Sequence, residues 1–383
     1  TRATRPEKTA HPLVELLRSW RDRAARLTGR TPTQLTDAAL RGSRRGRATR
    51  RGLRAGDLSE QVVARLAGET LDAVMARRST WTRWNLLAET ARTTRGLRLA
   101  TPAERHALHD RVIDAALATC VALDPGEVFT VPADYRRHDG TSVFARPGED
   151  AFTHQRILDA AERLAHATTD LDAPTALEAT ARRIATSPQP ARNPGGAPVR
   201  LADDQVDAII SIATSGRRLE VLVGPAGTGK TTTLRALRSA WETTYGQGSV
   251  IGLAPSATAA HELADALHIG CENTAKWLHE TVGPGALTRG AILDGLTVRR
   301  ERAVAAGDMA ALRTMGEATL ALEREQALWV LRPGQLLIVD EASLAGTFTL
   351  DTLTAQATAA GAKVLLVGDH HQLSAVDAGG AFG

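Results

Sequence analysis

The segment from Gly224 to Thr232 combines residue types that hold the phosphates of a nucleotide. It reads GPAGTGKTT and fits the pattern G-x-x-x-x-G-K-[ST], in which glycines let backbone N–H groups curl around an anion. Lys230 is expected to reach the β and γ phosphates, and the Thr231 hydroxyl offers a ligand to Mg²⁺. We predict that ATP is bound by Gly224, Pro225, Ala226, Gly227, Thr228, Gly229, Lys230, Thr231 and Thr232.

An acidic pair follows the apolar run Leu336 to Val339. Asp340 is expected to hold Mg²⁺ through water, and Glu341 is expected to polarise the water that attacks the γ-phosphate. Such a pair also suits the start of a helix, but the phosphate-binding loop upstream favours the catalytic interpretation. We therefore assign catalytic roles to Lys230 and Glu341, and Mg²⁺ binding to Thr231 and Asp340.

Two glutamines are predicted to contact the nucleotide from outside the loop. Gln372 comes shortly after the apolar run Val364 to Val367, and it is a candidate sensor of the γ-phosphate because neighbouring parallel strands end at the same edge of a sheet. Gln205 comes before the loop, and its amide suits the donor and acceptor on the adenine edge. A surface glutamine without a ligand is the alternative for Gln205. His370 and His371 have no further ligand cluster beside them, so we expect no metal there.

After residue 198 short apolar runs alternate with helical stretches, as in a buried parallel sheet. The predicted strands are Leu219 to Val223, Val250 to Ala254, Leu336 to Val339 and Val364 to Val367. A helix from Thr231 to Ala240 is expected to follow the loop. The fold class is α/β: residues 200–383 are expected to form a P-loop domain with a parallel sheet, carrying a helical insertion at about residues 281–331.

Residues 1–186 are predicted to form a mostly helical region. After Pro12, apolar residues recur at three- and four-residue steps, which predicts an amphipathic helix. The run Thr101 to Glu104 is typical of a capping box with proline at the first helical position. Asp139-Gly140 favours a small hairpin near residues 134–145. Residues 187–199 are rich in proline and glycine, which predicts a linker between domains.

Three features are candidates for contact with nucleic acid. The tract Arg41 to Arg54 contains seven arginines and is either a solvated linker or a phosphate-binding arm. The segment Ala254 to Thr258 offers hydroxyls and amides either to a nucleic-acid backbone or to an ordinary helix cap. Trp81 and Trp84 lie three residues apart on one helical face, which favours packing in a core over stacking on bases.

The composition argues against several classes of protein. Although 43% of the residues are hydrophobic, no stretch approaches the roughly 20 apolar residues of a membrane span, and no signal-peptide pattern is present. We therefore expect a cytoplasmic protein with no membrane insertion. Cys120 and Cys271 are far apart and outside any C-x-x-C spacing, which argues against a disulfide framework and a zinc site. The net charge of +4 permits salt-sensitive binding to nucleic acid.

The segments GPAGTGKT, APSATAA, IVDEAS and VGDHHQL occur in the order of motifs I, Ia, II and III of superfamily 1 helicases, and residues 200–383 resemble the RecD-like branch with its RecA-like domain. The phrase ENTAKWLHE at residues 272–280 and the motif that ends at Gln205 are similar to the helicase portion of actinobacterial MobF-type conjugative relaxases, of the TraA or TrwC type. The resemblance implies an ATP-driven 5′ to 3′ DNA helicase acting on single-stranded plasmid DNA, with the conjugation machinery as a candidate partner. The alternatives are a RecD-like recombination or repair helicase and a DNA-binding adaptor with vestigial ATP binding.

Parts of such relaxases are not expected in this chain. The amino-terminal tyrosine and histidine cluster is missing, because the only tyrosines are Tyr135 and Tyr245, so we expect no nicking activity. The sequence stops soon after motif III, so we expect a second RecA-like domain and an upstream relaxase domain in the full-length protein. An arginine finger from that second domain would be worth about 10³ to 10⁵ in turnover, so this chain alone is expected to hydrolyse ATP slowly and not to unwind DNA.

Overall fold

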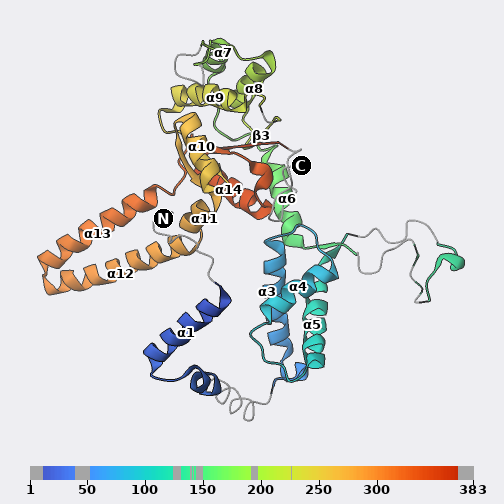
Figure 1. The fold of residues 1–383 in the computed structure, drawn as a ribbon. Coiled ribbons are helices and arrows are strands. Elements are labelled where there is room, and N and C mark those ends of the chain that lie inside the picture. The colour runs from blue at the N-terminus through green and yellow to red at the C-terminus, as the bar shows by residue number, and fades with distance from the viewer. Residues whose placement is uncertain are drawn as a thin grey trace.

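The structure is a computed structural model, shown as a ribbon in Figure 1. It describes residues 12–38, 52–123, 131–138, 140, 142–143, 150–190, 197–225 and 227–369. An α/β unit, a helical bundle and a long helical hairpin are its main parts. Within these described ranges, no helix is long and apolar enough to cross a membrane.

A parallel sheet of five strands forms the centre of the α/β unit, in the order β3-β7-β6-β4-β5. Its strands are β3 (Leu219–Val223), β4 (Val250–Ala254), β5 (Gly270–Asn273), β6 (Leu336–Val339) and β7 (Lys363–Gly368). All residues of β6 and β7 are buried, as expected for the apolar runs that predicted them. The predicted α/β class with a parallel sheet is confirmed.

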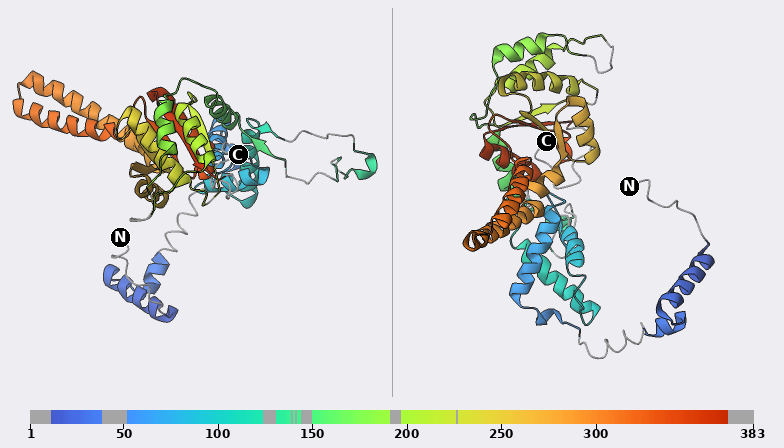
Figure 2. Two further views of the ribbon diagram at one scale, coloured as in Figure 1. Left: turned by 90° about the horizontal axis from the view of Figure 1, so that it is seen from above. Right: turned by 90° about the vertical axis from the view of Figure 1, so that its left-hand side faces the viewer.

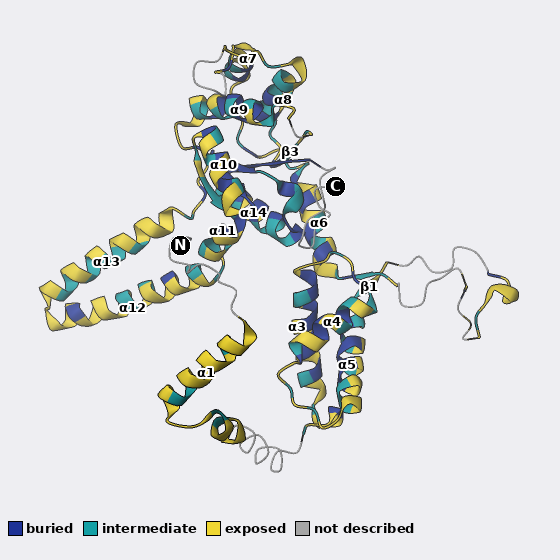
Figure 3. Cartoon of the chain, viewed as in Figure 1, coloured by how far each residue is buried: buried dark blue, intermediate teal, exposed yellow. Residues whose placement is uncertain are grey.

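Helices cover both faces of this sheet and create two cores. One core joins the sheet to α7 (Glu178–Thr186), α8 (Asp203–Thr214), α9 (Lys230–Tyr245) and α10 (Ala257–Leu267). The other core joins it to α6 (Gln155–Ala167), α11 (Thr274–Thr281) and α14 (Thr347–Ala360). Figure 3 shows the burial concentrated between these layers. Both faces of the central strands β6 and β7 are therefore covered, which explains their continuous apolar character, whereas Val221 and Val223 of the edge strand β3 stay partly exposed.

The packing of α6 and α7 differs from the predicted domain boundary. Leu164 of α6 belongs to one core of the α/β unit, and Ala181 of α7 belongs to the other. Between α7 and α8, Gln189 and Val199 exchange two backbone hydrogen bonds of 2.8 and 2.9 Å. The α/β unit thus begins before α6, whereas the sequence placed a linker at residues 187–199. A helical pattern shows which face of a helix is apolar, but not which neighbour covers it.

A helical bundle lies on the N-terminal side, and its core also includes Ile157 of α6. It contains α3 (Glu60–Met75), α4 (Arg83–Thr93) and α5 (Pro102–Leu117). Thr101 caps α5 as predicted, because its Oγ accepts from the Glu104 N–H at 3.2 Å. The Glu104 carboxylate, however, accepts from the N–H of Ala55 at 2.7 Å, so it ties α5 to the chain before α3.

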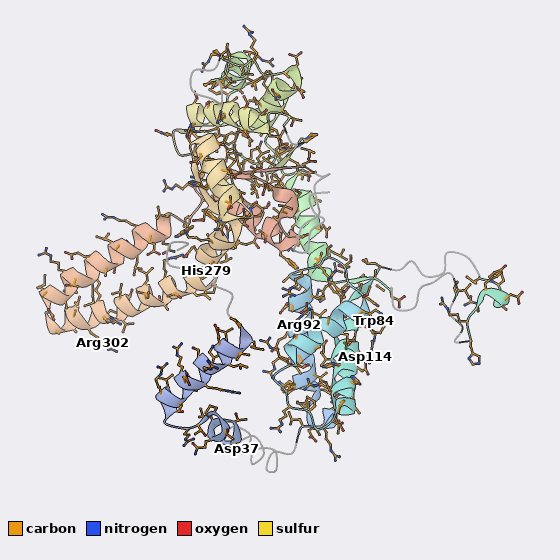
Figure 4. All side chains as sticks on the ribbon, in the orientation of Figure 1. Asp37, Trp84, Arg92, Asp114, His279 and Arg302 are labelled. Atoms are coloured by element: carbon orange, nitrogen blue, oxygen red, sulfur yellow. The ribbon has the colours of Figure 1, made fainter. Side chains whose placement is uncertain are left out.

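The two tryptophans of the bundle have different environments. Trp81 is buried, in line with the predicted core packing. Trp84 on α4 is 65% exposed, so the prediction of core packing is wrong for this residue (Figure 4). The two lie three residues apart, but α4 begins only at Arg83, so they do not share a helical face.

Two short N-terminal predictions fall on described residues. The predicted amphipathic helix is α1 (Leu13–Thr28). It has no buried residue, so no other described part of the chain packs over its apolar face. Near the predicted hairpin, Arg136 and Ser142 form an antiparallel bridge, and Gly140 has a φ of 83°. Asp139 and most of the arginine tract lie outside the described residues.

The stretch between α11 and β6 forms a helical hairpin. Its arms are α12 (Pro284–Ala306) and α13 (Met309–Ala327), which pack side by side and project from the α/β unit in the views of Figures 1 and 2. No residue of α13 is buried. At the base, the Arg289 guanidinium of α12 contacts the carboxylate and the backbone carbonyl oxygen of Glu280. The hairpin is therefore attached to the α/β unit mainly through its base.

Candidate nucleotide-binding site

The loop after β3 has the backbone conformation that its glycines predict. Gly227 and Gly229 have φ values of 84° and 82°, a region that other residues rarely adopt. A Cβ atom on Gly229 would lie 2.6 Å from the side-chain nitrogen of Gln205, so a larger residue would displace this amide as well as strain the backbone. Helix α9 begins immediately afterwards, at Lys230. Its first N–H groups have no partners within the helix and carry partial positive charge, which suits an anion.

Lys230 folds back over the loop that precedes it. Its Nζ donates to the carbonyl oxygen of Pro225 at 2.9 Å and also contacts that of Gly224. Both partners are weak acceptors compared with a phosphate oxygen, so a bound phosphate would compete well for this ammonium group. Burial raises the pKa of Asp340, and the positive charge of Lys230 offsets part of this rise.

The acidic pair follows β6 and is held to its neighbours by backbone hydrogen bonds. The Asp340 N–H donates to the Leu253 carbonyl of β4 at 2.8 Å, and Oδ1 of Asp340 accepts from the Glu341 N–H at 2.9 Å. Burial raises the pKa of both carboxyl groups, and the charges of Asp340 and Glu262 raise that of Glu341 further. A carboxylate with a raised pKa is a better proton acceptor at neutral pH.

A cavity of about 330 Å³ brings the loop and the acidic pair together at the carboxyl edge of the sheet. The predicted residues that line it are Gly227, Gly229, Lys230, Thr231, Thr232, Asp340 and Glu341. The cavity thus combines a cation, helix N–H groups, a hydroxyl and two carboxylates. This donor set fits the phosphates of a nucleotide together with a hard divalent cation, which prefers oxygen ligands.

A neighbouring cavity of about 310 Å³ lies on the other side of the loop, and Gln205, Gly224, Pro225 and Thr228 line it together with Lys230. The Gln205 side-chain nitrogen donates to the Thr228 carbonyl at 2.8 Å, and its side-chain oxygen accepts from the Ala202 N–H at 3.0 Å. Gln205 therefore joins the start of α8 to the loop. One further donor and one further acceptor site of the amide remain for a ligand in this cavity.

Sequence reasoning missed two side chains in the phosphate cavity. Asp369 directly follows β7 and is 8% exposed, and Arg235 extends from α9. Arg235 is four residues after Thr231, a spacing that places both on one helical face, but the sequence does not show what that face contacts. Of the other predicted site residues, Ala226 and Gln372 lie outside the described residues, as do His370 and His371. Among the residues described, no cluster of three or more histidine, cysteine or acidic groups forms a metal site.

A glycine-rich loop that opens a helix, beside an acidic pair at the end of a buried parallel strand, defines a P-loop nucleotide-binding domain. Residues 200–383 match the family described as the AAA domain. This part of the chain is thus similar to AAA domains of the P-loop type.

Three curated proteins are similar to part of this chain. The chain is 28% identical over 209 residues to the conjugal transfer protein TraA of Rhizobium radiobacter, a match that covers 55% of this chain and 14% of the relative. It is 27% identical over 183 residues to a probable conjugal transfer protein TraA of Sinorhizobium fredii, covering 48% and 12%. It is 33% identical over 180 residues to the ATP-dependent RecD2 DNA helicase of Deinococcus radiodurans, covering 47% and 19%. The chain therefore spans less than a fifth of the length of each relative. The predicted similarity to RecD-like and TraA-type helicase regions is confirmed.

Proposed function

We propose that residues 200–383 form the ATP-hydrolysing motor domain of a DNA helicase that acts on single-stranded DNA during conjugative transfer. The observation that carries this proposal is the phosphate cavity, where Lys230, Thr231, Asp340 and Glu341 meet. The similarity to TraA proteins supports the role in conjugation, and the similarity to RecD2 supports the helicase activity. A RecD-like recombination helicase is the second candidate, which the 33% identity to RecD2 favours.

Each residue of the cavity has a task in the proposed reaction. Lys230 and the N–H groups at the start of α9 bind the β and γ phosphates, and Gln205 binds the adenine edge from the second cavity. Thr231 and Asp340 would hold Mg²⁺, which would neutralise charge on the phosphates. Glu341 accepts a proton from the attacking water, and burial favours this by raising its pKa.

Single-stranded DNA is proposed to contact the carboxyl end of β4. Ser256 there is the N-cap residue of α10, and its Oγ accepts from the Ala259 N–H at 3.1 Å. The start of a helix presents N–H groups that suit a DNA phosphate. Movement in the 5′ to 3′ direction and a place in the conjugation machinery belong to this proposal through the resemblance alone.

The test measures ATP turnover of the 383-residue chain with and without single-stranded DNA, alongside binding of a fluorescent ATP analogue with Mg²⁺. Slow turnover that rises with DNA, and that Lys230→Ala abolishes together with analogue binding, is the expected result. Equal turnover in Lys230→Ala would show that the cavity is not the site of hydrolysis. DNA binding without any binding of the nucleotide would favour the adaptor instead.

A further inference from the structure

Arg235 is a cation in the phosphate cavity to which the loop motif gives no role. It lies in α9 four residues after Thr231, so both side chains share one face of the helix. Its side chain lines the same cavity as Lys230 and the acidic pair. The G-x-x-x-x-G-K-[ST] pattern ends at Thr231, so the position of Arg235 needs a separate explanation.

The same guanidinium also holds the end of α10. Its Nε donates to the Ala266 carbonyl oxygen at 2.5 Å, and within the described residues this is its one hydrogen bond. The last carbonyl groups of a helix lack partners and carry partial negative charge, so an arginine stabilises them. Because this bond uses only Nε, the terminal nitrogens of Arg235 remain for a ligand in the cavity.

The opposite end of α10 lies at the proposed DNA contact. The helix begins directly after Ser256 and runs for 11 residues to Leu267. At the usual rise per residue it is about 16 Å long. A hydrogen-bonded helix of this length moves largely as one body, so a shift at Ser256 is transmitted to Ala266. Helix α10 thus connects the DNA contact to Arg235.

We propose that Arg235 is a positioning residue that couples nucleotide binding to DNA binding. Its terminal nitrogens contact the distal phosphates, while its Nε holds the C-terminal end of α10. The inference rests on the proposed function and identifies the residue that links ATP to single-stranded DNA. One guanidinium serves both partners, so a shift of α10 changes its contact with the phosphates. By linkage, ATP must then change the affinity for DNA by the same factor as DNA changes the affinity for ATP.

Arg238 provides a matched control in the same helix. Its Nη1 donates to the Leu267 carbonyl oxygen at 2.5 Å, and its Nε donates to Glu242 at 2.8 Å. The described lining of the phosphate cavity includes Arg235 but not Arg238. Both arginines therefore stabilise the end of α10, and only Arg235 also reaches the cavity.

The experiment measures the affinity of the 383-residue chain for a fluorescein-labelled single-stranded oligonucleotide by anisotropy. Each protein is titrated with and without a non-hydrolysable ATP analogue and Mg²⁺. For the wild type and Arg238→Gln, we expect the analogue to change the DNA affinity by about fivefold or more, as in typical allosteric coupling. For Arg235→Gln we expect a change below about twofold. Arg235→Lys keeps the charge but has one nitrogen, which cannot hold α10 and contact the phosphates at the same time, so it should also lose the coupling.

Melting curves by circular dichroism verify that every variant folds. Coupling of wild-type size in Arg235→Gln would overturn the assignment, and so would a wild type that binds both ligands without coupling. Equal losses in Arg235→Gln and Arg238→Gln would overturn it too, because fixation of α10 alone would then account for the effect. A wild type that binds no DNA at all would instead contradict the proposed function, which separates the two failures.

Discussion

Glu341 has a backbone conformation that is unusual for its residue type. Its φ of 50° lies in the left-handed region, which within the described residues only one other non-glycine residue, His268, adopts. This conformation costs on the order of 1 to 3 kcal/mol, and such strain concentrates at functional sites. A glycine would remove the strain, but it would also remove the carboxylate from the cavity. The conformation is therefore consistent with a role for the carboxylate in the reaction.

Replacing Glu341 should separate hydrolysis from binding. Glu341→Gln keeps the size and polarity of the side chain but cannot accept a proton, so turnover should fall by about 10²- to 10⁴-fold. Binding of a fluorescent ATP analogue should stay within about twofold, since Lys230 and the loop remain. Steady-state phosphate release and analogue titration measure the two effects. Undiminished turnover would remove Glu341 from its assigned role as base.

Lys363 is a fully buried cation at the start of β7. Its Nζ donates to the carbonyl oxygens of Ile212 and Ser215 at 2.7 and 2.5 Å, and it lies 3.8 Å from a carboxylate oxygen of Glu220. Burial lowers the pKa of Lys363 from 10.5 to about 8, and Glu220 opposes this effect. The folded chain therefore releases this proton at lower pH than the unfolded chain does.

The sign of the resulting pH dependence follows from proton counting. Between pH 8 and 10.5 the unfolded state binds more protons at Lys363 than the folded state, so the free energy of unfolding rises with pH. Below about pH 8 the cost of burying the charge is constant. In Lys363→Met this rise in the free energy of unfolding should disappear. The rise in the wild type should be on the order of a few kcal/mol, since one pKa unit corresponds to about 1.4 kcal/mol.

Urea unfolding of wild type and Lys363→Met at several pH values from 7.5 to 10.5 checks this dependence, the window being set by the pKa values above. Lys276→Met is the control, because Lys276 is half exposed and its pKa is raised, not lowered, by Glu272. A wild type and Lys363→Met with parallel pH profiles would show that Lys363 keeps an ordinary pKa in the folded chain.

At the scale of elements, the α12–α13 hairpin depends on its base. Arg289 is 6% exposed, contacts Glu280 and lies 3.6 Å from a carboxylate oxygen of Glu325. Farther along α12, Arg302 is exposed to solvent (Figure 4). A buried guanidinium that loses its partners, or a carboxylate that loses its guanidinium, is strongly destabilising, whereas exposed charges contribute little.

Arg289→Ala should therefore loosen the hairpin and leave the sheet intact. Amide hydrogen exchange in α12 and α13 should accelerate by about tenfold or more, because each 1.4 kcal/mol of lost local stability corresponds to a factor of ten. Exchange in β6 and β7 should not change. Arg313→Ala, which removes an exposed pair with Glu317, is the control and should have no effect. Equal acceleration in the sheet would mean that the hairpin is part of the α/β core.

The sequence predicted the elements whose residue types carry their own signal. The strands β3, β4, β6 and β7 follow from apolar runs, because a sheet covered on both faces requires them. In contrast, β5 contains Glu272 and Asn273 and lies at the edge of the sheet, so polar residues suffice and no apolar run reveals it. The loop and the acidic pair were recognisable from their motifs. Arg235 was not, because its position depends on how α9 packs against α10.

At the scale of the whole molecule, the α/β unit includes helices from the N-terminal side of the predicted linker. Arg163 of α6 forms two hydrogen bonds to Asp351 of α14, at 3.0 and 2.6 Å, and α6 also contributes to the core beneath α14. Helix α7 packs on the opposite face against α8 and α9. Without α6 and α7, both faces of the sheet would have uncovered apolar side chains.

Truncation tests this boundary. A chain of residues 200–383 should aggregate or melt without cooperativity, because each apolar side chain left exposed forfeits about 1.5 to 3 kcal/mol. A chain of residues 150–383 should be monomeric and should bind the ATP analogue within about threefold of the full chain, since it retains both cores. Size-exclusion chromatography and thermal melting distinguish the two. A cooperative transition in the shorter chain would show that residues 200–383 fold independently, with the domain boundary at residues 187–199 as the sequence predicts.

The strand order also has a consequence for the timing of folding on the ribosome. Among the described strands, β3 pairs only with β7, which the ribosome produces about 140 residues later. At the usual rate of 5 to 20 residues per second, this is a delay of roughly 7 to 28 seconds. During this interval the phosphate-binding loop follows a strand that has no partner. The bundle of α3, α4 and α5 can already fold, because most of its core residues have been synthesised. The nascent chain is thus most exposed to misfolding between these two events, when β4, β5 and β6 can already pair but β3 still lacks its partner.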